Sequence, residues 1–250
     1  LYALAGLIAV GICAAAVALL WMDRRASWTQ AYVSASNLTE VLAADIGRTI
    51  HVYDLSLQGV IERLQEPGIR DLPRATLHRF LFDRSASAEF LGTILILDSE
   101  GNVVYDSQTI EPPKANFADR DFFQVHRDSA DAGMYVSRPY RSRLRDGDES
   151  IGISRRLSNL DGSFAGVVTG SLRLAFFRER FARLSLGPQD SITILRNDGA
   201  VIARSPYSST DLGADIGQAK AFQQFLIRRD GAFVGALAPD GVERLYTFDT

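Results

Sequence analysis

The pattern of apolar and polar positions divides the chain into three stretches of different character. Residues 1–22 contain no charged side chain and consist almost entirely of leucine, alanine, valine, isoleucine and glycine. As a helix rising about 1.5 Å per residue they would extend roughly 33 Å, which is enough to cross a hydrocarbon core of about 30 Å. The stretch therefore predicts a transmembrane helix. The alternatives are a cleaved signal peptide, whose apolar region is usually about 7–15 residues long, and a buried core helix, in which a polar stripe is expected.

From residue 23 to residue 66 the apolar positions recur at helical spacing. They advance by a mean of about 3.6 residues, and the first proline after them is Pro67, followed by Gly68. The positions are Trp28, Tyr32, Ala35, Leu38, Leu42, Ile46, Ile50, Tyr53, Leu57, Ile61 and Leu64. The sequence predicts one long helix continuous with the membrane span. It could transmit a displacement across the bilayer, lie along one side of a domain, or do both.

Residues 67–250 mix short strand-like and helical patterns, which is typical of an α+β fold. Runs rich in β-branched residues between Asp-Gly and Pro-Gly turns indicate antiparallel strands. The pattern predicts helices at 77–82, 119–126 and 175–184, and strands at 93–97, 103–105, 135–144, 151–157 and 164–174.

Part of this pattern occurs twice. Segment 94–104 aligns with 192–202, and 133–136 aligns with 231–234, both displaced by 98 residues. Two anchors at one offset predict two copies of a hairpin, helix and strand unit. The first copy would occupy 67–186 and the second 187–250, where it lacks its last strand.

Composition and motifs argue against several classes of function. The net charge of −3 and the absence of a basic tail make nucleic acid an unexpected partner. Cys13 is the single cysteine, so no intrachain disulfide can form. His51, His78 and His126 form no zinc-binding pattern, and nucleophile-elbow, P-loop and dinucleotide-binding motifs are absent. No metal, cofactor or catalytic residue is predicted, and a membrane-anchored hydrolase is a minor alternative. His126 is expected on the surface of its helix.

The order and spacing of several strings resemble the double Cache (tandem PAS-like) sensor family over about residues 24–250. The strings are Arg120-Asp121-Phe122-Phe123, Gly133-Met134-Tyr135-Val136-Ser137-Arg138-Pro139, Ile153-Ser154-Arg155-Arg156-Leu157 and the paired Asp-Gly hairpins. The resemblance implies a periplasmic sensor domain of a bacterial inner-membrane receptor, with ligand bound in the membrane-distal unit 67–186. It also implies a cytoplasmic output domain, most often a diguanylate cyclase, otherwise a histidine kinase or chemoreceptor. A homodimer is expected, and a scaffold without ligand is the alternative from another class.

Arginines on apolar strand faces indicate where an anion could bind. Strand alternation would place Arg138 on one face with Val136 and Tyr140, and Arg155 on a face with Ile153. A guanidinium on a buried face is costly unless it is paired, and a ligand carboxylate or phosphate would match it in geometry. The alternative is an internal partner, such as Asp106, Asp121 or Glu149. A second set indicates a solvated edge: Arg141, Arg143 and Arg145.

In amino-acid-binding relatives an Arg-x-aromatic-aromatic string covers the pocket, with the arginine on the carboxylate and the rings as walls. The resemblance transfers these roles to Arg120, Phe122 and Phe123, for which a surface position and core packing are the alternatives. The chain has Ala115 where those relatives have an aromatic residue, and Ser171 where an acid holds the amine. A small anionic ligand without an amine therefore fits better than an α-amino acid. The candidate ligand-binding residues are Arg120, Phe122, Phe123, Arg138, Arg155, Tyr135 and Ser171.

Overall fold

The computed structural model describes residues 2–82, 91–145, 147–208, 210, 213–219, 222–236 and 241–250. Within that part the chain forms two compact units. One comprises Leu1–Ile46 with Ala219–Thr250, and the other Gly47–Gln218. The domain boundaries expected from the sequence, 67–186 and 187–250, stay a prediction.

The predicted long helix is confirmed as α1 (Tyr2–Leu64), which ends before Pro67. Its register places Tyr53, Leu57 and Val60 in the core of the second unit. Of the helices in the described ranges, none is both long enough and apolar enough to cross a membrane. The predicted span at 1–22 includes residues 1–5 and 7–10, whose side chains lie outside the described residues.

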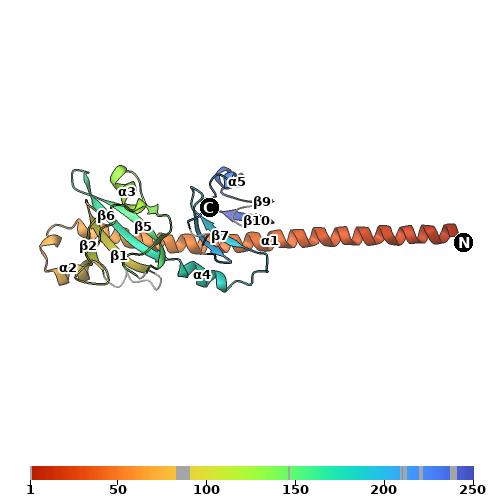
Figure 1. The fold of residues 1–250 in the computed structure, drawn as a ribbon, viewed down its shortest axis with the longest axis horizontal. Helices are drawn as coiled ribbons and strands as arrows, with labels where there is room; N and C mark the ends of the chain where they lie inside the picture. Colours follow the sequence, from red (N-terminus) through yellow and green to blue (C-terminus); the bar gives the residue numbers. More distant parts are fainter. Residues whose placement is uncertain are drawn as a thin grey trace. The chain divides into compact units, whose positions relative to one another are not determined.

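The second unit is built on an antiparallel sheet, six strands in the described residues, in the order β2-β1-β6-β5-β3 with β4 also paired to β5 (Figure 1). The strands are β1 (Leu91–Asp98), β2 (Val103–Asp106), β3 (Tyr135–Val136), β4 (Tyr140–Arg141), β5 (Glu149–Ser158) and β6 (Phe164–Arg173). The short helices η1 (Ile69–Asp71) and α2 (Arg74–Leu81) precede β1, α3 (Asp121–Asp128) connects β2 to β3, and α4 (Ala175–Ala182) follows β6. The expectation of an α+β fold with a long N-terminal helix and antiparallel sheets is confirmed.

Helices α1 and α3 cover opposite faces of this sheet (Figure 1). On the α1 face, Gly170 leaves room for Tyr53, because a Cβ at Gly170 would lie 2.8 Å from Tyr53 Cε1. On the α3 face, Gly152 leaves room for Phe122, at 3.1 Å from the corresponding position. The two glycines therefore let a helix-borne ring approach each face closely.

A β-bulge interrupts the pairing of β1 with β6. Leu91 pairs with Leu172 and Ile94 with Gly170, so Gly92 and Thr93 both oppose Ser171. The Tyr53 hydroxyl fills the break: it accepts the Gly92 N–H at 2.9 Å and donates to the Ser171 carbonyl at 2.6 Å. Burial strongly raises the pKa of this phenol, so it stays a neutral donor and acceptor.

The strand expected at 135–144 is wrong in its extent. β3 ends at Val136 and β4 holds Tyr140 and Arg141, with an irregular segment between them. Pro139 lies in that segment, and a proline has no N–H to donate to a ladder. Strand alternation therefore does not continue from Val136 to Arg138, and the Arg138 side chain is 48% exposed. The expected position of Arg138 on an apolar face is corrected accordingly.

The repeated hairpin is confirmed. β7 (Ile192–Leu195) and β8 (Val201–Ser205) pair in the register of β1 and β2 shifted by 98 residues, with the bulge at the same place. The turn glycines Gly101 and Gly199 also share a positive φ, 87° and 89°. The other unit contains α5 (Phe222–Ile227) and the hairpin β9 (Asp230–Ala236) and β10 (Glu243–Asp249).

Candidate ligand-binding site

The seven residues predicted from the sequence fall into separate places in the second unit. Arg120 and Phe122 belong to the α3 face of the sheet, and Ser171 belongs to the same face through its pairing with Gly152. Arg155 points to the opposite face, and Arg138 lies at an exposed edge. Phe123 and Tyr135 also lie on the α3 face, so the structure brings five of the predicted residues to one face and separates Arg138 and Arg155 from them.

Arg155 is paired with an acid that the sequence did not suggest. Its guanidinium donates to both carboxylate oxygens of Asp54 in α1, with Nη2 at 2.8 Å from Oδ2. The hydrogen bond from Arg155 lowers the pKa of Asp54, and Gln58 Nε2 donates to the same carboxylate at 2.8 Å. This pair joins α1 to β5, and it satisfies Nε and Nη2 of the guanidinium with a carboxylate.

Arg138 and Tyr135 belong to a network that links β3 to the turn of the second hairpin. Arg138 donates to Asp198 at 2.9 Å and to Asp215 at 3.4 Å. Arg196 lies over the Tyr135 ring, 5.0 Å from its centroid, and also binds Asp198. Burial raises the pKa of Asp198, but hydrogen bonds from Arg196, the Ala200 N–H and Arg138 lower it to about 2. Arg138 and Arg196 are therefore paired with acids of the same chain, Asp198 and Asp215.

Phe122 and Phe123 are both buried, and they differ in what they contact. Phe123 faces the Phe164 ring at 5.4 Å, within the apolar cluster of the α3 face. Phe122 faces the Tyr140 ring at 5.7 Å and lies over Gly152. Phe122 is thus placed beside Arg120 and Ser171, while Phe123 has a packing role.

Arg120 has a buried atom without a partner. Its Nε has no hydrogen-bond acceptor among the described residues, although it is shielded from solvent. Nη2 donates to the Arg141 carbonyl at 3.3 Å, and the guanidinium carbon lies 5.0 Å from the centre of the Tyr140 ring. A buried guanidinium N–H without an acceptor destabilises the folded protein, so binding of an acceptor at this position would be favourable.

A second guanidinium reaches the same face and was missed by sequence reasoning, which expected a solvated edge. Arg145, in the loop between β4 and β5, donates through Nη2 to the Thr93 hydroxyl in the bulge of β1. Thr93 is buried opposite Ser171. Arg145 lies in a loop, where side chains follow no periodic pattern. The sequence therefore does not indicate that Arg145 reaches the sheet, apart from the small residues on the face that it approaches.

We call the group formed by Thr93, Arg120, Phe122, Tyr140, Arg145, Gly152 and Ser171 the two-arginine site. It combines two guanidiniums with two rings, small hydroxyl residues and Gly152, which the Phe122 ring covers. Burial raises the pKa of Tyr140 to about 12; the nearby charges of Arg120 and Arg145 act to lower it, and that of Asp121 acts to raise it. The site therefore combines positive charge with low solvent access, which strengthens binding of an anion.

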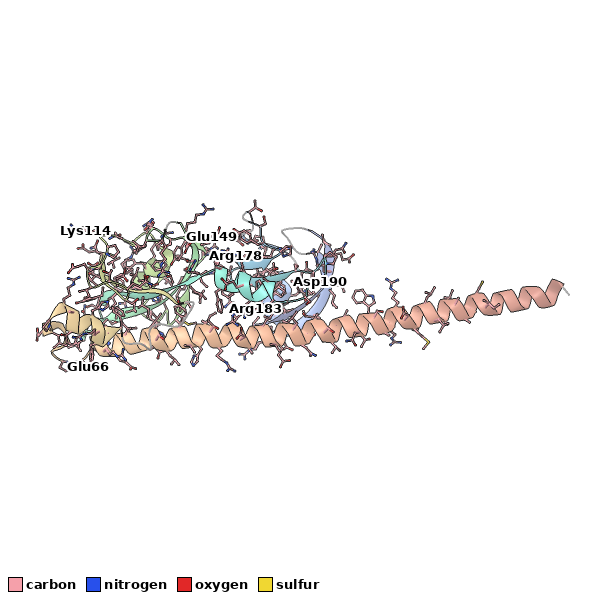
Figure 2. All side chains as sticks on the ribbon, turned by 90° about the horizontal axis from the view of Figure 1, so that it is seen from below. Glu66, Lys114, Glu149, Arg178, Arg183 and Asp190 are labelled. Atoms are coloured by element: carbon pink, nitrogen blue, oxygen red, sulfur yellow. The ribbon has the colours of Figure 1, made fainter. Side chains whose placement is uncertain are left out.

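The carboxylates around the site are already engaged. Asp119 holds Arg143 at 2.5 Å, and Asp121 accepts the Phe122 N–H at 2.8 Å and the Arg138 N–H at 2.8 Å. Glu149, at the start of β5, binds Arg178 of α4 at 3.0 Å (Figure 2). In the described part of the chain, no carboxylate lies within 4 Å of the Arg120 or Arg145 guanidinium.

His126 lies behind the site, and the expectation that it is a surface residue is wrong. The side chain is fully buried, with Nε2 3.0 Å from the Ser154 hydroxyl and Nδ1 without a hydrogen-bond partner in the described structure. Burial lowers the pKa of His126 to about 4. The imidazole is therefore neutral at physiological pH. Across the described residues, no group of three or more potential ligands could hold a metal ion.

The second hairpin does not repeat the site. Phe117 and Ile216 each donate a backbone N–H to the carbonyl of the turn glycine of their own hairpin, which aligns the segments that follow. In this alignment Ala219 stands where the first copy has Arg120. The candidate chemistry is therefore specific to the first copy.

Comparisons with known proteins confirm the resemblance to double Cache sensor domains. A dCache_1-like family model, described as a histidine kinase sensor domain, matches residues 175–250. The extracellular domain of rpHK1S-Z16, a protein classed as a histidine kinase, is similar at 27% identity and a TM-score of 0.69, with 88% of each chain covered.

Two chemoreceptor structures share the fold at lower identity. The periplasmic sensory domain of Tlp1 from Campylobacter jejuni has 12% identity and a TM-score of 0.67, covering 86% of this chain and 88% of its own. The ligand-binding domain of CtaA from Pseudomonas fluorescens, solved with L-valine, has 15% identity and a TM-score of 0.54, covering 86% and 94%. No protein of curated function matches the chain.

Proposed function

We propose that this chain is the extracytoplasmic sensor part of a bacterial membrane receptor and that it binds a small anionic metabolite at the two-arginine site. The observation that carries the proposal is the buried Nε of Arg120, which has no acceptor among the described residues. A ligand carboxylate would accept from Nε and a terminal nitrogen together, in the bidentate geometry that suits guanidinium. The similar extracellular and periplasmic sensor domains support this reading.

The location and the output are part of the proposal. Residues 1–22 would anchor the chain in the inner membrane, with two PAS-like units in the periplasm, and the chain would act as a homodimer. The family model and rpHK1S-Z16 favour a histidine kinase output, with a chemoreceptor as the second option. A diguanylate cyclase output rests on the sequence resemblance alone.

The bulge of β1 offers a route from ligand to helix. Thr93 and Ser171 meet the site on one face of the sheet, while the Tyr53 hydroxyl of α1 binds the same bulge from the other face. A ligand that prefers one arrangement of the bulge would shift the position of α1, whereas a ligand with equal affinity for both arrangements would shift nothing. The coupling thus depends on differential contact with Thr93 and Ser171.

A thermal-shift screen of the purified chain tests binding. The probes are acetate, lactate, pyruvate, malonate, succinate, malate, glutarate, citrate, phosphate, L-alanine and L-valine. At 100 times the dissociation constant a ligand stabilises the folded state by about 2.7 kcal/mol, which raises Tm by roughly 5–10 °C for a chain of this size. We expect at least one anion to produce such a shift and Arg120→Gln to abolish it.

Arg127→Gln is the matched control, because Arg127 lies on α3, the helix that begins directly after Arg120, with its side chain exposed and paired with Asp128. It should leave the shift unchanged. A shift that survives in Arg120→Gln would place the ligand elsewhere. If no probe stabilises the wild-type chain, the dimeric scaffold without ligand becomes the better account.

A further inference from the structure

Arg145 is the feature of the site that neither the sequence pattern nor the family resemblance assigns. It comes from a loop whose neighbouring arginines are engaged elsewhere: Arg143 binds Asp119, and Arg141 is exposed and 3.9 Å from Glu149. Among the described side chains, the Arg145 guanidinium donates a hydrogen bond only to the neutral hydroxyl of Thr93. A partly buried guanidinium forms a stronger hydrogen bond with a carboxylate than with a neutral hydroxyl, so a ligand carboxylate would bind favourably in place of Thr93.

We propose that Arg145 and Arg120 together select a small dicarboxylate, one carboxylate bound by each guanidinium. This inference rests on the proposed function and specifies the ligand class of the same site. The Arg120 guanidinium lies over the Tyr140 ring, and the charge of Arg145 also acts on the Tyr140 hydroxyl, which places both guanidiniums near this ring. Phe122 and Tyr140 would contact the carbon chain of the ligand, and the hydroxyls of Thr93 and Ser171 would bind the oxygens that Arg145 leaves free.

The hydrogen-bonding capacity of the two guanidiniums favours a dianion over a monoanion. Asp54 and Asp119 pair with Arg155 and Arg143, while Asp121 accepts neutral donors and Arg145 is near enough to Asp106 to act on its pKa. In the described part of the chain, Arg120 and Arg145 form no salt bridge with a carboxylate. A monocarboxylate would neutralise one of them and leave the other facing a desolvated apolar chain, which is unfavourable.

The acid that could hold an ammonium group is Asp106, and its setting argues against an amino acid. Asp106 pairs with Leu95 in the β1–β2 ladder and so belongs to the α3 face. Its Oδ1 already accepts the Gln108 N–H at 2.8 Å, and burial raises the pKa of the carboxyl even though that bond and the charges of Arg145 and His78 act to lower it. A carboxyl that is costly to ionise is a poor partner for an amine.

Titration calorimetry at fixed ionic strength tests the inference, with malonate, succinate and glutarate against butyrate and L-valine. We expect at least one dicarboxylate to bind the wild-type chain 10-fold or more tighter than butyrate. Arg145→Gln should weaken that dicarboxylate roughly 10- to 100-fold, the loss expected for a hydrogen bond to a charged group, and change butyrate less than about 3-fold. Arg141→Gln, at the end of β4 just before this loop and 73% exposed, is the matched control.

The outcomes separate this inference from the proposed function. If Arg145→Gln retains dicarboxylate affinity while Arg120→Gln loses it, Arg145 has no part in the site and the proposed function stands. Tighter binding of L-valine or butyrate than of every dicarboxylate would overturn the ligand class but not the sensor role. No binding of any dicarboxylate also overturns the inference, and the wider screen then judges the function. Should Arg145→Gln not fold, Arg145→Lys, which keeps the charge but not the planar fork, is measured instead.

Discussion

The Tyr53 hydroxyl is one of the contacts through which α1 binds the sheet, and its removal gives a sharp prediction. Tyr53→Phe keeps the buried ring but leaves the Gly92 N–H and the Ser171 carbonyl without the bonds of 2.9 and 2.6 Å that they now make. Each unsatisfied buried group costs about 1–3 kcal/mol, so with some relaxation we expect a loss of roughly 2–4 kcal/mol. For a chain of this size that lowers Tm by roughly 5–15 °C.

Differential scanning calorimetry measures this loss, with Tyr32→Phe as the control. Tyr32 lies on the same helix but is 46% exposed. Removing its hydroxyl should therefore change the free energy of unfolding by less than about 0.5 kcal/mol. If Tyr53→Phe behaves like Tyr32→Phe, the hydroxyl does not replace the missing ladder bonds. The proposed route from the bulge to α1 would then lose its physical basis.

Three further predictions concern the same unit. Gly170→Ala should cost about 1–3 kcal/mol in urea denaturation, because its Cβ would meet the Tyr53 ring, and a neutral result would contradict the packing described. Asp54→Asn should cost roughly 2–4 kcal/mol at pH 7, since it leaves the Arg155 guanidinium without its carboxylate. The folded pKa of Asp54 lies below its unfolded value, so this stabilisation is present above about pH 4 and is lost as pH falls through the folded pKa. If wild type and Asp54→Asn differed in unfolding free energy as much at pH 2 as at pH 7, the assignment would be refuted. His126 has a folded pKa of about 4 against about 6.5 unfolded, so the unfolded state binds more protons between these values and stability should fall by roughly 3 kcal/mol from pH 6.5 to pH 4. His126→Asn should flatten that slope, and parallel curves for the two proteins would contradict it.

The features that the sequence predicted well depend on local periodicity. The long helix follows from apolar spacing without a proline, and the two hairpins follow from polar turns that contain Gly101 and Gly199 and are flanked by β-branched residues. The offset of 98 residues also relates the strand pairings of the two hairpins. Leu97 pairs with Val103 in the first, and Leu195 pairs with Val201 in the second. Such patterns act within a few residues, so one sequence suffices to read them.

The partners of the arginines depend on distant segments and could not be read in this way. Arg155 binds an acid 101 residues earlier, and Arg138 binds one 60 residues later. Alternation identified Arg155 as a residue needing an anion, but the choice between ligand and internal acid depends on where α1 packs. The placement of Arg138 was wrong because Pro139 interrupts the strand. Arg145 lies in a loop, where no period applies.

The central claim is that an anion binds at Arg120, and the side-chain Nε–H signals of arginine in an NMR titration test it most directly. The titrant is the carboxylate that gives the largest thermal shift, and the Arg120 and Arg155 signals are assigned from Arg120→Gln and Arg155→Lys spectra. We expect the Arg120 signal to move on saturation, since its Nε now has no acceptor in the described structure, and the Arg155 signal to stay, since Asp54 already holds it. A moving Arg155 signal beside an unchanged Arg120 signal would contradict the account.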